Sequence, residues 1–124
     1  MANDIYESGE DYLETILRLQ KQISQVRSID VAHALDYSKP SVSRAMKILS
    51  EKGLIYMDEK KYIHLTDLGL PKAENVARRH RLIRTALIDI FDVSPDVAEE
   101  DACRIEHIVS DETIEKIAAK IGAE

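Results

Sequence analysis

The sequence has little of several residues that mark particular classes of protein. Its 124 residues include one cysteine, four glycines, three prolines and no tryptophan. A single cysteine excludes an internal disulfide framework and suits a reducing cytoplasm. Scarce glycine and proline predict few tight turns and long helices. No apolar run approaches the roughly 20 residues of a membrane-spanning helix, and the polar segment 1–9 is unlike a signal peptide. We therefore expect a cytoplasmic protein without a membrane partner.

The chain is acidic overall, with a formal net charge of −6, but its charges are unevenly distributed. Between residues 37 and 57 there are four lysine and arginine residues and one glutamate, so this segment is locally basic. A local basic patch can bind phosphate even on an acidic protein. Five acidic residues lie between 92 and 101. Such a cluster indicates either a solvated face or a cation site.

The spacing of apolar residues predicts a mainly α fold. We expect helices at 4–22, 28–35, 40–52, 70–91, 95–109 and 110–122, with two short strands at 54–57 and 62–66. Ser28 and Ser110 are the expected N-caps, Pro40 a first-turn residue and Gly53 the residue that ends the third helix. The order helix, short helix, turn, helix, hairpin is that of a winged helix-turn-helix. The sequence therefore predicts a DNA-binding domain at 1–70 and a helical domain at 71–124.

The third predicted helix has two chemically different faces. Its apolar face predicts docking on the preceding helices and consists of Val42, Ala45, Met46 and Leu49. Its opposite face carries small hydroxyls and basic side chains, which suit a helix in the major groove. We expect base contacts from Ser41, Ser43 and Arg44, and phosphate contacts from the lysines. The expected DNA-binding residues are Ser38, Lys39, Pro40, Ser41, Ser43, Arg44, Lys47, Lys60 and Lys61. The alternative is an ordinary solvated helix face.

Three segments carry side chains that could bind a metal ion. The candidates are Asp11 with Glu14, His80, and Cys103 with Glu106 and His107 at i, i+3 and i+4 on one predicted helix. Mixed oxygen, nitrogen and sulfur donors suit Mn(II) or Fe(II) rather than a structural zinc site. The alternatives are solvated acids, surface histidines and a small buried cysteine. Periodicity alone does not bring the three segments together.

Several short segments carry a resemblance to a known family. They are Glu10–Ile16, Ser38–Ser43, Arg79–Leu82, Ala102–His107 and Val109–Glu112. They resemble the diphtheria toxin repressor and manganese transport regulator family of metal-dependent transcriptional repressors. The resemblance implies a homodimer that binds double-stranded operator DNA, with Mn(II) or Fe(II) as co-repressor and metal-uptake genes as targets. It also implies no catalytic activity.

The resemblance implies a hybrid ligand set. Asp11 and Glu14 match the manganese branch, Cys103 matches the iron branch, and the remaining ligands match both: His80, Glu106 and His107. We favour Mn(II), because the oxygen ligands are more numerous. Arg84 and Glu99 lie at positions of the iron branch's ancillary site. Arg84 cannot ligate, so that site is expected to be absent or altered. The sequence is also too short for the SH3-like third domain of the longer iron regulators.

We expect metal binding to lock the first helix against the long one and so set the spacing of two recognition helices in a C2 dimer. Dimer contacts are expected from Leu87, Ile90, Phe91, Ile108, Val109, Ile114 and Ile117, or these residues form an intramolecular core. One alternative function is a winged-helix regulator that needs no metal. An enzyme with a catalytic metal is disfavoured, because no glycine-rich loop or nucleophile elbow is present.

Overall fold

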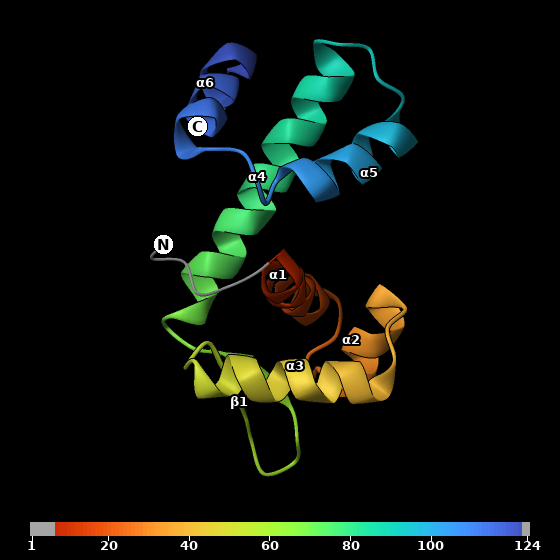
Figure 1. The fold of residues 1–124 in the computed structure, drawn as a ribbon, viewed down its shortest axis with the longest axis vertical. Coiled ribbons are helices and arrows are strands. Elements are labelled where there is room, and N and C mark those ends of the chain that lie inside the picture. The colour runs from red at the N-terminus through yellow and green to blue at the C-terminus, as the bar shows by residue number, and fades with distance from the viewer. Residues whose placement is uncertain (1–6, 123–124) are drawn as a thin grey trace. The chain divides into compact units, whose positions relative to one another are not determined.

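The computed structural model describes residues 7–122 and is mainly helical, as predicted (Figure 1). The chain divides into two compact units, Met1–Glu74 and Asn75–Glu124, and each is described here by itself. The predicted helix at 4–22 begins outside the described residues, which start at residue 7. Within the described part, no helix is both long and apolar enough to cross a membrane.

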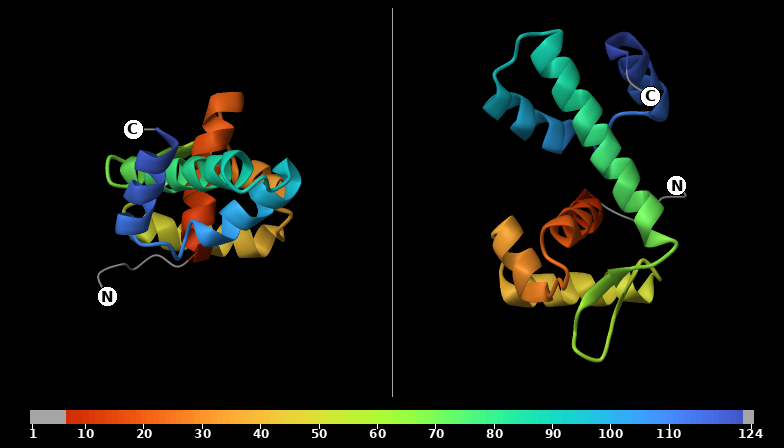
Figure 2. Two further views of the ribbon diagram at one scale, coloured as in Figure 1. Left: turned by 90° about the horizontal axis from the view of Figure 1, so that it is seen from above. Right: turned by 180° about the vertical axis from the view of Figure 1, so that it is seen from behind.

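The N-terminal unit is built on three helices, α1 (Glu7–Gln22), α2 (Ser28–Leu35) and α3 (Lys39–Glu51). The helices contact one another pairwise and enclose a common apolar core. This arrangement can be followed from two further directions in Figure 2. Large apolar side chains that are almost fully buried in this unit include Leu13, Ile16, Val26, Val31, Val42, Met46, Ile55 and Ile63. The predicted docking face of α3 is thus confirmed, with Val42, Met46 and Leu49 buried.

Local capping explains where these helices begin and end. The Ser38 hydroxyl accepts a hydrogen bond from the Ser41 N–H and caps α3, and Pro40 lies in the first turn as predicted. Gly53 follows the end of α3 with φ +77°, a conformation that favours glycine. The prediction for α2 was wrong by one residue: Arg27 is the N-cap, and its N–H donates to the Asp30 carboxylate at 2.8 Å.

Strands β1 (Ile55–Met57) and β2 (Ile63–Leu65) form an antiparallel hairpin in which Tyr56 pairs with His64. Both strands are shorter than predicted. The hairpin is attached to the helices because the Ile63 N–H donates to the Val26 carbonyl at 2.7 Å. After the hairpin, Gly69 lies so close to the Leu54 backbone that a Cβ would clash with its carbonyl oxygen. Only glycine fits there.

The long helix α4 (Gly69–Asp89) begins in the N-terminal unit and continues into the C-terminal unit, which also contains α5 (Pro95–Ile105) and α6 (Asp111–Ile121). The core of this unit comprises Leu82, Ile83, Ala102, Ile114 and Ala118. Ser110 caps α6 as predicted. The prediction that the preceding helix extends to Val109 was wrong, because α5 ends at Ile105 and residues 106–108 form a turn.

Candidate DNA-binding surface and metal site

The predicted DNA-binding residues of α3 lie on its exposed side. Ser41 is half-buried, and the other predicted residues of the turn and helix are exposed: Ser38, Lys39, Pro40, Ser43, Arg44 and Lys47. Side chains at the start of α3 are connected by hydrogen bonds. The hydroxyls of Ser38 and Ser41 lie 2.8 Å apart, and an Arg44 guanidinium N–H donates to the Ser41 hydroxyl at 3.4 Å. These contacts order Arg44 without burying it, so its guanidinium stays available to an external acceptor.

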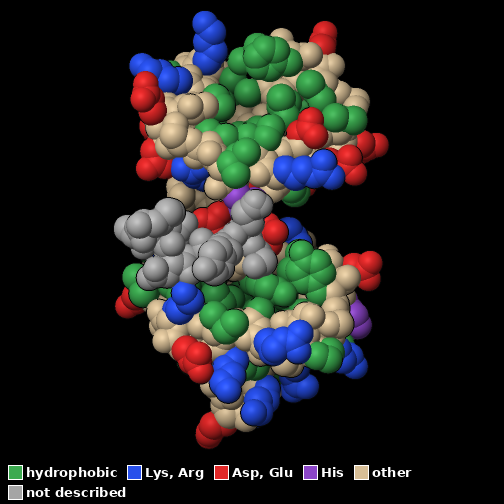
Figure 3. Space-filling view, viewed as in Figure 1, with side chains coloured by type: hydrophobic (Ala, Val, Ile, Leu, Met, Phe, Trp, Pro, Cys, Tyr) green, Lys and Arg blue, Asp and Glu red, His purple; other side chains and the backbone are tan. Residues whose placement is uncertain are grey.

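The hairpin turn presents two exposed lysines, Lys60 and Lys61. The Asp58 carboxylate organises this turn by accepting the N–H groups of Lys60 and Tyr62 at 2.9 and 3.0 Å. A third hydrogen bond, from His64 at 2.8 Å, is the largest cause that lowers the pKa of Asp58. Figure 3 shows lysine and arginine side chains gathered at the end of this unit formed by α3 and the hairpin. This unit thus exposes the positive charge that a nucleic-acid binding face would need.

In the C-terminal unit, His80 of α4 lies between two carboxylates. Its Nδ1 is 2.8 Å from Glu106 Oε1, and its Nε2 is 3.0 Å from Glu99 Oε2. The Cys103 Sγ lies 3.9 Å from the same Nδ1. Hydrogen bonding with Cys103, and then with Glu106 and Glu99, raises the pKa of His80 to about 11 despite the opposing effect of burial. A cation that binds here would compete with the proton that these neighbours favour on His80.

Glu99, which the sequence analysis placed at a position of the family's ancillary site, was not included among the predicted ligands. Ligand atoms of His80, Glu99 and Cys103 all lie within 4.8 Å of one another. Glu99 also forms an ion pair with Arg84, whose Nε lies 3.0 Å from Glu99 Oε1. The i, i+4 spacing of Glu99 and Cys103 on α5 was the available signal, because that spacing places both on one helix face. Of the acidic residues between 92 and 101, Glu99 is thus the one drawn toward the candidate site.

Glu106 and His107 lie in the turn after α5 and not on the helix itself. The Glu106 side chain is 3% exposed, and its second oxygen lies 3.5 Å from the His107 Nε2. The predicted i+4 helical relationship between Cys103 and His107 was therefore wrong. The two oxygens of Glu106 nevertheless connect His80 with His107. Within the C-terminal unit, Glu106 thus connects His80 with His107, whereas Cys103 groups with His80 and Glu99.

The other two predicted ligands, Asp11 and Glu14, are half-buried residues of α1 in the N-terminal unit. Glu14 accepts a hydrogen bond from Arg18 at 3.3 Å. That Asp11 and Glu14 bind the same cation as His80 and Glu106 stays a prediction.

The residues predicted to form a dimer contact differ in their exposure. Phe91 is 68% exposed and Ile108 is 76% exposed, which is what we expect of residues that contact a second subunit. Ile90 is also exposed, whereas Leu87, Val109 and Ile117 pack in part against the core. Ile114 is 2% exposed and belongs to that core, so the prediction that it contacts a partner was wrong.

Fold and site together define a winged helix-turn-helix protein with a separate helical unit that brings together imidazole, carboxylate and cysteine side chains. Two family descriptions match it: "Iron dependent repressor, N-terminal DNA binding domain" over residues 4–65, and "Iron dependent repressor, metal binding and dimerisation domain" over residues 66–123. The chain belongs to the iron-dependent repressor family. This confirms the resemblance to the diphtheria toxin repressor and manganese transport regulator family.

Curated relatives and solved structures agree with this assignment. The chain is 35% identical to the transcriptional regulator MntR of Escherichia coli O157:H7 over 106 residues, covering 86% of this chain and 68% of that protein. It is 30% identical over 118 residues to the diphtheria toxin repressor of Corynebacterium diphtheriae, covering 95% of this chain and 52% of that protein.

Among solved structures, a manganese-dependent transcriptional repressor in complex with manganese matches with a TM-score of 0.85 and 32% identity. The metal-dependent transcriptional regulator MtsR matches with a TM-score of 0.87 and 30% identity. Each match covers 94% of this chain but only 53% and 54% of the other chains, so the chain spans about half the length of these structures. The winged-helix and helical architecture expected from the sequence is thereby confirmed.

Proposed function

We propose that this protein is a metal-dependent transcriptional repressor, in which Mn(II) or Fe(II) acts as co-repressor for binding to operator DNA. The observation that carries the proposal is the group formed by His80, Cys103 and Glu106 in a chain whose other unit is a winged helix-turn-helix. In this proposal the DNA-binding domain is 1–70, the metal-binding and dimerisation domain is 71–124, and metal-uptake genes are the targets. The protein works in the cytoplasm and catalyses no reaction.

The donor chemistry fits a divalent transition metal. Within the C-terminal unit, His80 and His107 offer imidazole nitrogens, Glu106 offers carboxylate oxygens and Cys103 offers a thiolate. Such mixed donors suit Mn(II) and Fe(II). A bound cation would supply positive charge that offsets the carboxylates. We favour Mn(II), because Asp11 and Glu14 of α1 would add two further hard oxygen donors.

The regulatory step follows from the position of the proposed ligands in the chain. His80, Cys103, Glu106 and His107 belong to the C-terminal unit, whereas Asp11 and Glu14 belong to the helix that packs against α2 and α3. If all six bind one cation, the unit that contacts DNA becomes restrained against the unit that dimerises. Restraint would favour one spacing of two recognition helices, which in a C2 dimer suits half-sites about 34 Å apart. The same coupling requires DNA to increase the affinity for metal.

A surface for the second subunit is available in the C-terminal unit. The side chains of Phe91 and Ile108 are mostly exposed, and large exposed apolar groups on one small unit favour burial against a partner. Figure 3 shows hydrophobic side chains gathered on the face of this unit that is turned to the viewer. We therefore propose a homodimer that uses this unit, consistent with the metal-binding and dimerisation description of the matching family.

The proposal is tested by DNA binding with and without metal. A duplex is first selected from a random pool in the presence of the protein and Mn(II), and its binding is then followed by fluorescence anisotropy. We expect tight binding with Mn(II) or Fe(II) under anaerobic conditions and a loss of affinity on adding EDTA. Equal affinity with and without EDTA would instead identify a winged-helix regulator that needs no metal. The matched control is a scrambled duplex of the same length and composition.

A further inference from the structure

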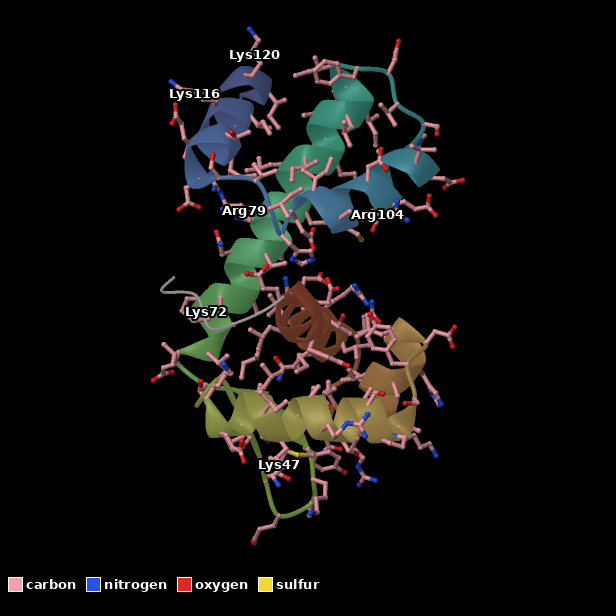
Figure 4. All side chains as sticks on the ribbon, in the orientation of Figure 1. Lys47, Lys72, Arg79, Arg104, Lys116 and Lys120 are labelled. Carbon is pink, nitrogen blue, oxygen red and sulfur yellow. The ribbon has the colours of Figure 1, made fainter. Side chains whose placement is uncertain are left out.

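The side chain of Arg79 connects three segments of the C-terminal unit. Arg79 belongs to α4, directly before His80, and its side chain is only 12% exposed. One guanidinium nitrogen, Nη1, donates to the Glu106 carbonyl at 3.1 Å and also to the Val109 carbonyl. The other, Nη2, lies 2.5 Å from an Asp111 carboxylate oxygen at the start of α6. Figure 4 labels Arg79 beside the turn that joins α5 and α6.

The two carbonyls that Arg79 contacts lie at the two ends of the turn: that of Glu106 at the end of α5, and that of Val109 directly before Ser110, the N-cap of α6. The last carbonyls of an α-helix have no intrahelical N–H to accept, and Glu106 is the C-cap of α5. A basic side chain near that end satisfies them and also interacts favourably with the helix dipole. Arginine suits the task, because its planar guanidinium has five donors in a fixed arrangement. Arg79 thus holds both ends of the turn at 106–109.

This turn carries Glu106 and His107, two of the proposed metal ligands, and Arg79 is the neighbour of a third, His80. We infer that Arg79 is a positioning residue: it sets the separation of Glu106 and His107 from His80 before a cation binds. The inference rests on the metal site of the proposed function. Arg79 itself binds no metal, because guanidinium donates hydrogen bonds and accepts none. Outer-shell partners of this kind typically change metal affinity 10- to 100-fold when they are mutated.

The neighbouring arginine offers a matched control. Arg78 makes a bidentate pair with Glu115 of α6 at 2.9 and 3.2 Å. This pair also connects α4 with α6, but it does so without the carbonyls of Glu106 and Val109. Replacing Arg78 therefore removes a link of similar charge and geometry between the same two helices.

The experiment compares the full chain with Arg79→Gln, Arg79→Lys and Arg78→Gln. Hydrogen exchange of the Ile108 and Val109 amides is measured in metal-free protein, and Mn(II) affinity by titration. The absorption spectrum of the Co(II)-loaded protein reports ligand geometry. We expect Arg79→Gln to exchange faster in the turn, to bind Mn(II) about 10- to 100-fold more weakly and to show an altered Co(II) spectrum. Arg79→Lys should recover part of the affinity, and Arg78→Gln should resemble the wild type.

The outcomes separate the inference from the function on which it rests. Wild-type Mn(II) affinity and Co(II) spectrum in Arg79→Gln would overturn it, and so would equal losses in Arg79→Gln and Arg78→Gln. If the wild type binds neither Mn(II) nor Co(II), the proposed function fails. Unchanged hydrogen exchange of the turn amides in Arg79→Gln would contradict the positioning role, whatever the wild type binds. Thermal unfolding of each variant identifies one that does not fold, and Arg79→Lys then carries the test.

Discussion

The two units of this chain use charged side chains in opposite ways. In the N-terminal unit, Arg44, Lys47 and Lys60 are exposed and reach outward from α3 and the hairpin. In the C-terminal unit, His80 and Glu106 are largely withdrawn from solvent and contact each other. Exposed charges suit a partner that brings its own opposite charge, as DNA does. Paired, withdrawn charges suit a small ion that replaces a proton.

This difference teaches that the two surfaces respond differently to mutation. Removing an exposed cation leaves its neighbours hydrated, so only affinity for the external partner falls. Removing one member of a buried pair leaves the other without compensation, which costs far more. Each of the following changes alters a side chain of one unit, and for the residues of the two sites its direct effect is measured on the ligand of that unit: metal affinity without DNA, or DNA affinity at saturating metal.

The largest effect is expected for Glu106→Gln. Its carboxylate contacts both His80 and His107, so an amide in its place removes a ligand and also the counter-charge of the imidazoles. We expect Mn(II) affinity to fall by more than about 100-fold, beyond the range typical of outer-shell changes. Isothermal titration with Mn(II) measures it. Glu115→Gln, which alters an exposed carboxylate of α6, is the control. Mn(II) binding by Glu106→Gln at wild-type affinity would remove Glu106 from the site.

Arg44→Ala should have the next largest effect, on DNA alone. Loss of a guanidinium that hydrogen-bonds a base costs about 1–3 kcal/mol of discrimination. Anisotropy with the selected duplex at saturating Mn(II) should therefore show affinity reduced about 5- to 150-fold. Mn(II) affinity in the absence of DNA should be unchanged. Lys21→Ala, an exposed lysine near the end of α1, serves as the control. A fall in Mn(II) affinity without DNA would mean that the two units are not separable in this way.

Local features were predictable from the sequence, and features that depend on distant residues were not. Ser110 and Gly53 act within a few residues of their own positions, and both were predicted correctly. The N-cap of α2 was misplaced by one residue, and Ser38 was not predicted as the N-cap of α3. The end of α5 was missed, because the apolar Ile108 and Val109 continue the helical pattern. That end is stabilised by Arg79, which lies 27 and 30 residues away from the carbonyls that it contacts.

The candidate metal site shows the same limit. Cys103, Glu106 and His107 were selected by their spacing and by the family resemblance, whereas the contact of Glu99 with His80 required the packing of α5 against α4. The spacing of apolar residues does not reveal ion pairs between helices, such as that of Arg84 with Glu99. Residue types therefore indicated the chemistry of the site, and tertiary packing decided which carboxylate faces which nitrogen.

Lys60→Ala should produce a smaller and more general effect on DNA. An exposed lysine of the hairpin turn is expected to contact phosphate, which carries no sequence information. Affinity should fall by a similar factor for selected and scrambled duplexes. The slope of log affinity against log salt should decrease by about 0.9 for the one lost contact. Lys60 is preferable to Lys61, because Lys61 has a φ of +70° and its substitution also alters a residue with an unusual backbone conformation. An unchanged slope would place the hairpin turn away from the DNA backbone.

The smallest effect is expected for Asp58→Asn, which probes the order of the hairpin turn. Hydrogen bonding, led by that of His64, lowers the pKa of Asp58, so the folded state favours the ionised carboxylate. The resulting stabilisation is present above the usual pKa of about 3.8 and is lost as the pH falls through the lower folded-state value. Thermal unfolding should therefore show a Tm difference between wild type and Asp58→Asn at pH 7 that narrows on acidification. Asp67→Asn, an exposed neighbour, is the control. A difference that widens at low pH would reverse the sign of this linkage and assign the order of the turn to some other contact.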